Sequence, residues 1–184
     1  MAKEAENVGR RGAVPWRILG WGLAALLLLL PLAANAPWTA SDFLFAGGLM
    51  AGVGLVFELT VRMSRSHAYR AGVAFALAAA FLIVWANGAV GMIGDEDNPY
   101  NLFFLGVIGL ALAGAAIVGF RAAGMALAMA IAGVAQIVLA AVGMSTDLRG
   151  GVVSAILAGA WLVSATLFQK AAWDQRQAAP APPA

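Results

Sequence analysis

Long apolar runs alternate with short polar segments along almost the whole chain. A transmembrane helix needs about 20 mostly apolar residues to cross roughly 30 Å of hydrocarbon. Six segments have this character: residues 18–36, 43–61, 71–92, 102–120, 124–144 and 150–168. None shows the polar stripe of a surface helix or the short alternating segments of barrel strands. The pattern therefore predicts an all-α fold, a polytopic transmembrane bundle of six helices.

The predicted spans divide the chain into three parts. Residues 1–17 form a cytoplasmic N-terminal segment, residues 18–168 the six-helix transmembrane domain, and residues 169–184 a cytoplasmic tail. The end of the chain is polar and rich in Ala and Pro, a composition typical of disordered termini. We expect the tail to be disordered.

Basic residues set the orientation, because the cytoplasmic loops of membrane proteins carry an excess of Lys and Arg. When the six spans alternate in direction, ten basic residues fall on one side: Lys3, Arg10, Arg11, Arg17, Arg62, Arg65, Arg70, Arg121, Lys170 and Arg176. The other side holds Arg149 together with Asp42, Asp95, Glu96, Asp97 and Asp147. This asymmetry predicts that both termini are cytoplasmic.

The first span also has features of a cleavable signal. Arg10-Arg11 precedes a leucine run, and residues 34–36 read Ala-Asn-Ala, which matches a signal-peptidase site. Pro37 would directly follow the cleaved bond, and proline fits that position poorly. We therefore expect the first span to be retained. Cleavage would leave five spans, and the direction of the others would not change.

The composition supports a membrane protein and excludes other classes. Of the 184 residues, 62% are hydrophobic and 11% charged, against roughly 45–50% and 25% in soluble domains. A water-soluble enzyme and a disordered chain are both excluded, because so few charges cannot cover a soluble surface. The net charge of +2 is small, and the excess of basic residues is explained by their place in the cytoplasmic loops. We therefore expect no nucleic-acid partner. The chain has no cysteine and therefore no disulfide, thiolate zinc site or iron–sulfur cluster.

Several catalytic patterns are absent from the sequence. His67 is the only histidine, which excludes a haem held by two histidines of one chain and an H-E-x-x-H zinc site. There is no G-x-S-x-G motif, no Walker A motif and no lysine within a span. We expect no enzymatic activity, no cofactor and no metal site.

A few polar residues fall inside the spans, where each is a candidate functional group. Glu58 precedes Arg62 by four residues, the favourable order for an ion pair on a helix. We expect a structural pair at the cytoplasmic interface; the alternative is a proton or cation site. Asn87 and Gln136 lie in the outer halves of their spans. We expect them to hydrogen-bond across helices or to freed backbone; the alternative is a polar pathway.

The outer loop after the third span is the most distinctive stretch. Asp95, Glu96 and Asp97 precede Asn98-Pro99, and this pair is typical of a helix start, with Asn as the N-cap and Pro at the first position. The carboxylates would then interact well with the helix dipole. Alternatively, the three acids bind a divalent cation. No EF-hand spacing accompanies them.

Residues 85–101 read W-A-N-G-A-V-G-M-I-G-D-E-D-N-P-Y-N. This stretch resembles a block in small multi-pass bacterial inner-membrane proteins of uncharacterised function. Asp42-Phe43 and Glu58-Leu59 fit the same pattern, so that the resemblance covers roughly residues 38–120. It implies a location in the bacterial inner membrane and brings no activity, cofactor or catalytic residue with it.

Small residues and a weak repeat bear on packing. Gly48-x-x-x-Gly52, Gly106 with Gly109, and Gly151 with Gly159 predict helix faces that approach closely within the bundle. Shifted by 52 residues, segment 71–95 matches segment 123–147 at several positions, including Asp95 with Asp147. The match is that of a duplicated helical hairpin, although alanine richness also produces such matches.

Two function classes fit these observations. The first is a non-catalytic membrane protein that serves as an accessory or interaction subunit of a membrane complex. The second is a small channel or transporter that uses Glu58, Asn87 or Gln136. We favour the first, because transporter cores usually contain broken helices and several polar groups at the midplane. The expected surroundings are the lipid bilayer and either further copies of the chain or a larger complex.

Overall fold

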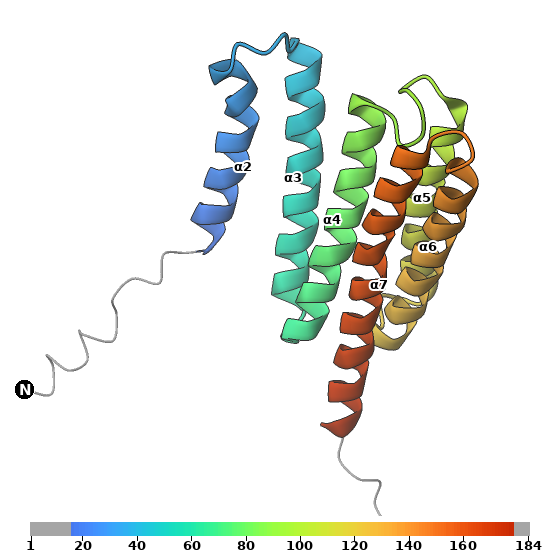
Figure 1. Ribbon diagram of the computed structural model, residues 1–184. Coiled ribbons are helices and arrows are strands. Elements are labelled where there is room, and N and C mark those ends of the chain that lie inside the picture. The colour runs from blue at the N-terminus through green and yellow to red at the C-terminus, as the bar shows by residue number, and fades with distance from the viewer. Residues whose placement is uncertain (1–15, 179–184) are drawn as a thin grey trace, which may run out of the picture. The chain divides into compact units, whose positions relative to one another are not determined.

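A computed structural model describes residues 16–178, and for Trp16 the backbone alone. The described residues form six α-helices and one short 3₁₀-helix (Figure 1). In chain order these are α2 (Trp16–Ala33), α3 (Ala40–Met63), α4 (His67–Ala89), η1 (Pro99–Asn101), α5 (Leu102–Ile117), α6 (Ala122–Gly143) and α7 (Leu148–Gln177). The predicted all-α class is confirmed. Most of the predicted N-terminal segment 1–17 lies outside the described residues.

Five helices are long and apolar enough to cross a membrane: α3, α4, the joined segment Pro99–Ile117, α6 and α7. Large apolar side chains are exposed on every helix, which is the surface that a lipid environment requires. The predicted first span corresponds to α2, whose 18 residues extend about 27 Å. This helix is slightly shorter than the hydrocarbon core.

The first of two compact units comprises residues 1–54, with α2 and the first part of α3. The backbone N–H of Thr39 donates to the carboxylate of Asp42 over 2.6 Å, which secures the start of α3. A methyl group added at Gly54 would lie 2.7 Å from the Trp21 ring, and one at Gly47 would lie 3.4 Å from Leu28. Glycine therefore lets α2 and α3 approach each other within this unit.

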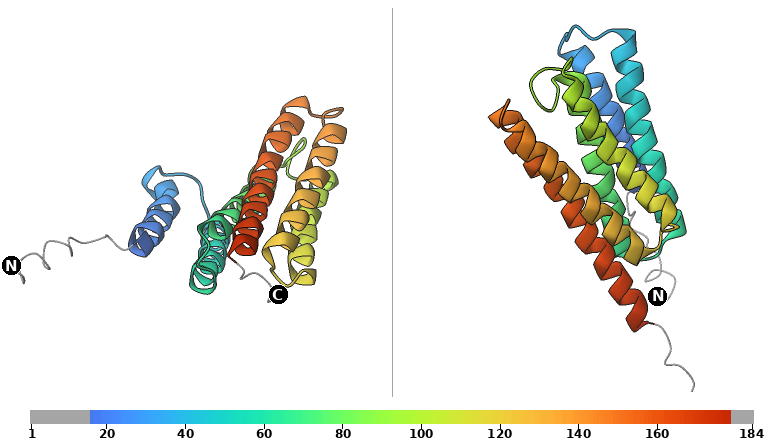
Figure 2. Two further views of the ribbon diagram at one scale, coloured as in Figure 1. Left: turned by 90° about the horizontal axis from the view of Figure 1, so that it is seen from below. Right: turned by 90° about the vertical axis from the view of Figure 1, so that its right-hand side faces the viewer.

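The second unit comprises residues 55–184, with the end of α3 and helices α4–α7. In this unit α7 packs along both α4 and α6, and α6 also packs on α5 (Figures 1 and 2). Direct contact between α4 and α5 is sparse. The spatial order of the bundle is therefore α4, α7, α6 and α5, with the α4–α5 side the most open.

Buried positions recur at helical spacing and hold many small side chains. On α5 they are Phe104, Val107, Ala111 and Ala115. Bulky side chains are rarer in the interior, where Trp161, Phe104 and Phe168 are the largest fully or almost fully buried ones. This composition is typical of membrane bundles, in which helices associate through close packing of small residues.

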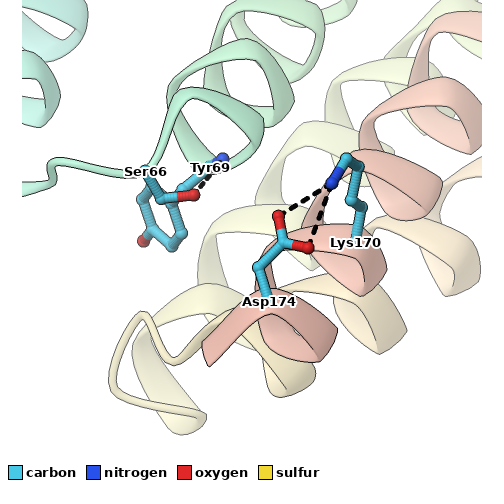
Figure 3. Close-up of polar contacts among 4 residues, drawn as sticks. All are labelled: Ser66, Tyr69, Lys170 and Asp174. Atoms are coloured by element: carbon cyan, nitrogen blue, oxygen red, sulfur yellow. Dashed lines mark hydrogen bonds and ion pairs between the residues drawn. The ribbon is translucent and has the colours of Figure 1, made fainter. Parts of the chain in front are cut away.

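Helix α7 continues past the predicted end of its span to Gln177. Residues 169–177 are therefore helical, whereas we had expected a disordered tail. Ala171 and Ala172 are buried against Ala122, and the Lys170 ammonium lies 2.8 Å from the Asp174 carboxylate (Figure 3). These contacts explain the extension, because packing of one face stabilises a helix more than composition does. Residues 179–184 lie outside the described part.

The predicted glycine faces pack only in part. A methyl group at Gly151 would lie 2.9 Å from the Ala140 carbonyl oxygen of α6, as expected for a close helix contact. Added methyl groups at Gly48, Gly52, Gly106, Gly109 and Gly159 would meet no neighbouring atom within 4 Å. The prediction of close helix contacts is therefore wrong for these five glycines.

Candidate functional site

The candidate polar residues of the second unit lie in separate places. Two sets of loops lie at opposite ends of the bundle. The arginine end comprises residues 64–66 and 118–121, and the acidic end comprises residues 90–98 and 144–147. Glu58 and Arg62 lie near the arginine end, Asp95, Glu96 and Asp97 at the acidic end, and Gln136 inside the bundle. The structure therefore does not gather them into one site.

Glu58 and Arg62 form the predicted ion pair. The Arg62 guanidinium donates to Glu58 Oε1 over 2.6 Å. The Glu58 side chain is 17% exposed and that of Arg62 63% exposed. The acid is therefore largely covered, while its partner reaches outward, as a long side chain near a membrane interface does.

Gln136 joins α6 to α7 and is fully buried. Its amide nitrogen donates to the Ser154 carbonyl over 3.0 Å, and its amide oxygen accepts from the Trp161 indole N–H over 2.8 Å. The expected hydrogen bonding across helices is confirmed for this residue. A second link across helices connects α7 to α4, where the Ser164 hydroxyl donates to the Gly72 carbonyl over 2.7 Å.

Asn87 makes a different contact from the one expected. Its amide donates to the Ile83 carbonyl of its own helix over 2.8 Å. The amide thus bonds within α4, one turn back, and does not link this helix to a neighbour. Neither Asn87 nor Gln136 lines the apolar groove described below.

Asn101 organises the acidic end. Its side-chain oxygen accepts from the backbone N–H groups of Met92 and Ile93, over 3.1 and 2.8 Å. Its amide donates to the Asp95 carbonyl over 2.7 Å. Gly91 has a φ of 78°, and a methyl group there would collide with the Asp95 carbonyl, so only glycine fits easily. Asn101 is 4% exposed and thus acts as a buried hub for this loop.

Asn98 and Pro99 start a helix as predicted. The Asn98 side chain accepts from the Tyr100 backbone N–H over 3.0 Å, and Pro99 is the first residue of η1. Asp95, Glu96 and Asp97 are exposed beside this cap. Within residues 16–178, no group of three or more His, Cys, Asp or Glu residues is placed to hold a metal ion. The geometry therefore favours a capped, solvated acidic loop.

Asp147 connects the two loops of the acidic end. One carboxylate oxygen accepts from the Gly150 N–H over 3.0 Å at the start of α7. The other accepts from the Gly94 N–H over 3.1 Å in the loop after α4. These bonds, first to Gly150 and then to Gly94, lower the pKa of the Asp147 carboxyl below its ordinary value, since they favour its charged form.

Two side chains secure the arginine end. The Arg70 guanidinium donates to the carbonyls of Ser64 and Val61, both over 2.7 Å, and so caps the last turn of α3. The Tyr69 hydroxyl donates to the Phe120 carbonyl over 2.8 Å. The Tyr69 backbone N–H also donates to the Ser66 side chain, which caps α4 (Figure 3). His67 is the first residue of α4.

An apolar groove of about 140 Å³ occupies the arginine-end half of the bundle. It runs along α4 and α5 where these helices diverge, and its walls also include the end of α3. Met125, Met129 and Trp161 of α6 and α7 form its floor. A second, more open pocket lies around Glu58 and Arg62.

Asn101 and Trp161 are structural polar residues that the sequence analysis missed. Trp161 lies within a predicted span, whereas tryptophans of membrane proteins concentrate at the interfaces. A tryptophan in mid-span was therefore a signal for a buried hydrogen-bond acceptor. For Asn101, the signal was two glycines and two asparagines within eleven residues, Gly91 to Asn101, a composition typical of a tight, hydrogen-bonded loop.

Comparisons with known proteins add no identification. No protein family, no curated protein and no solved structure matches this chain. The fold of residues 16–178 therefore stands as the description: these residues are all-helical, with five apolar helices that are long enough to span a membrane.

Proposed function

We propose that this chain is a non-catalytic integral membrane protein that serves as an accessory or interaction subunit of a membrane complex. The observation that carries the proposal is the use made of the buried polar side chains of the described residues, of which the Ser154 hydroxyl alone has no hydrogen-bond partner. The side chains of Gln136, Trp161 and Ser164 hydrogen-bond to neighbouring helices. The side chain of Asn101 hydrogen-bonds to the loop that it supports. Groups committed in this way hold helices together and are not available to bind a substrate.

The proposed setting is the bacterial inner membrane, with six spans and both termini in the cytoplasm. The distribution of basic residues along the sequence supports this orientation. The resemblance of residues 85–101 to a block of bacterial inner-membrane proteins supports the location. Helix α2 is slightly short, so that it would cross where flanking residues or local thinning compensate.

Reporter fusions test the topology directly. Fusions at Ala36, Ser66 and Asn98 should report outside, inside and outside in turn. A cytoplasmic signal at Asn98 would show that the acidic end lies in the cytoplasm and would contradict the proposed orientation.

The alternative function is a small channel or transporter. It would use Glu58, Asn87 or Gln136, yet these three bond to different partners in different places. Glu58 already carries a cationic neighbour 2.6 Å away, whereas a proton-coupling carboxylate usually faces a cavity nearer the midplane. This arrangement favours the accessory role.

Two measurements separate the two functions. Mild-detergent purification from native membranes, followed by mass spectrometry and native gel sizing, should give one stoichiometric partner for an accessory subunit. Reconstitution of the chain alone in proteoliposomes should give no ion or proton flux. The Glu58→Gln variant should insert and fold with a loss of less than about 1 kcal/mol of stability, as expected for a partly exposed ion pair. A flux that Glu58→Gln abolishes, with folding intact, would establish the transporter instead.

A further inference from the structure

The groove between α4 and α5 has a wall whose side chains offer no free hydrogen-bond donor. Three side chains on it carry donors, and all three donors are used. The Thr60 hydroxyl donates to the Val56 carbonyl over 2.9 Å, the Tyr69 hydroxyl to Phe120, and the Trp161 indole to Gln136. Because these donors are used, a polar ligand would lose its hydration and find only the Thr60 and Tyr69 hydroxyl oxygens as acceptors. The groove suits hydrocarbon.

The dimensions of the groove select a chain rather than a helix. Along α4 its wall extends from Tyr69 to Ala80, which corresponds to about 16 Å of helix. A volume of about 140 Å³ is far too small for a helix, which measures about 10–12 Å across with its side chains. The volume is close to that of a cavity that binds one benzene ring, so part of one hydrocarbon chain fits inside and the rest would follow the open side of the groove.

Unpaired positive charge lies at one end of the groove. Phe120 lines that end, and Arg121 follows it directly with an exposed side chain. Arg65 is likewise exposed in the loop between α3 and α4. Among the described residues, neither arginine pairs with a carboxylate. The opposite end of the groove, at Ala80 and Ile108, lies within the apolar part of the bundle. A ligand with a hydrocarbon chain and an anionic head complements this gradient.

We propose that the groove binds one acyl chain of an anionic phospholipid, whose phosphate lies beside Arg121. The inference rests on the proposed membrane setting, in which the arginine end is the cytoplasmic interface. An acyl chain gains no hydrophobic free energy by leaving the bilayer for the groove. Selectivity therefore comes from the headgroup, and basic residues between helices on the cytoplasmic side are known to attract such headgroups.

The test uses the full chain purified in mild detergent and exposed to phosphatidylglycerol or phosphatidylcholine, with retained lipid counted by native mass spectrometry. Wild type should retain one phosphatidylglycerol in preference to phosphatidylcholine. One arginine near a headgroup corresponds to a preference of about fivefold. Arg121→Gln should abolish this preference. Arg176→Gln, at the far end of α7, is the matched control and should keep it.

A second pair of variants tests the groove itself. Ala76→Phe places a ring in the groove, whereas Ala78→Phe, two residues away on the exposed face of α4, does not. Ala76→Phe should lose the retained lipid and Ala78→Phe should keep it, with both variants giving wild-type elution profiles. Equal retention by the two variants, or equal binding of both lipids by wild type, would overturn the proposal.

The outcome is independent of the accessory role. Lipid retention is measured on the purified chain, so a missing partner leaves it unchanged. Reporter fusions and partner analysis do not depend on the groove, so loss of lipid binding leaves those results standing. A reversed reporter signal with lipid retained would overturn the cytoplasmic placement of the arginine end, while lipid binding in the groove would stand.

Discussion

The α6–α7 pair and the α4–α5 pair have the same hairpin topology, but the first pair packs closely and the second makes sparse contact. Each pair is a helical hairpin that turns at the acidic end (Figure 1). Between α6 and α7, Gln136 bonds to both Ser154 and Trp161, and Gly133 admits the Leu162 side chain. Between α4 and α5, direct contact is sparse. These helices are instead held at their ends, by Asn101 at one and by the Tyr69–Phe120 bond at the other.

The difference shows how a bundle of apolar helices can combine a closely packed interface, here called the α6–α7 seam, with an open groove between α4 and α5. Lipid gives helices little hydrophobic reason to associate, so close packing and hydrogen bonds decide which pairs close. Glycine at the crossing and a buried amide close α6 onto α7. Tethers at the two ends keep α4 and α5 in register while their middles stay apart, which leaves room for a hydrocarbon chain.

The first prediction concerns a substitution that disrupts the α6–α7 seam. A Cβ atom at Gly133 would lie 2.7 Å from the Leu162 side chain and 3.2 Å from the Trp161 Cβ. Gly133→Leu should therefore lower the free energy of unfolding by about 3 kcal/mol through overpacking. The control is Gly106→Leu on α5, where nothing lies within 4 Å and the change should be within about 0.5 kcal/mol. Thermal melts in detergent measure both, and similar losses would contradict the distinction.

The second prediction removes a tether of the open pair. Asn101→Ala takes away the acceptor of two buried backbone N–H groups, and the free energy of unfolding should fall by about 2 kcal/mol. Hydrogen exchange should speed up at Met92 and Ile93 before it does in the α6–α7 seam. The matched control is Asn87→Ala, because Asn87 bonds only within its own helix. A loss in that control as large as in Asn101→Ala would show that the hub has no special role.

The third prediction sharpens the role of the buried amide. Gln136→Leu keeps the side-chain volume but leaves the Trp161 indole N–H without its acceptor. We expect a loss of about 1 kcal/mol, since hydrogen bonds between membrane helices contribute modestly. Trp161→Phe should cost a similar amount, and the double variant should lose less than the sum. Strict additivity in this cycle would contradict a direct bond between the two side chains.

The sequence predicted individual helices and contacts within one helix better than contacts between different helices. Apolar run length located α3 to α7, and the Asn98-Pro99 pair marked the start of η1, because such signals are local. The Glu58–Arg62 pair was predictable for the same reason, since both residues lie on one helix. Gln136 was recognised as a polar contact, but its partner Trp161 was not. The sparse contact between α4 and α5, and hence the groove, depends on long-range packing that no local pattern encodes.

The joint between the two hairpins is the subject of the last prediction, which should have the smallest effect. Asp147 holds Gly94 of one hairpin and Gly150 of the other, and these bonds lower the pKa of its carboxyl below the ordinary value of 3.8. A group with a lowered folded-state pKa stabilises the fold above its unfolded pKa and loses that contribution as the pH falls through its folded pKa. The wild-type melting temperature should therefore be constant from neutral pH to about pH 5 and decrease below about pH 4. Asn at position 147 cannot take up a proton in this range, so the Asp147→Asn curve should lie slightly lower at neutral pH and converge with the wild type in acid. Parallel curves for the two proteins between pH 7 and 3 would show that Asp147 does not couple the hairpins.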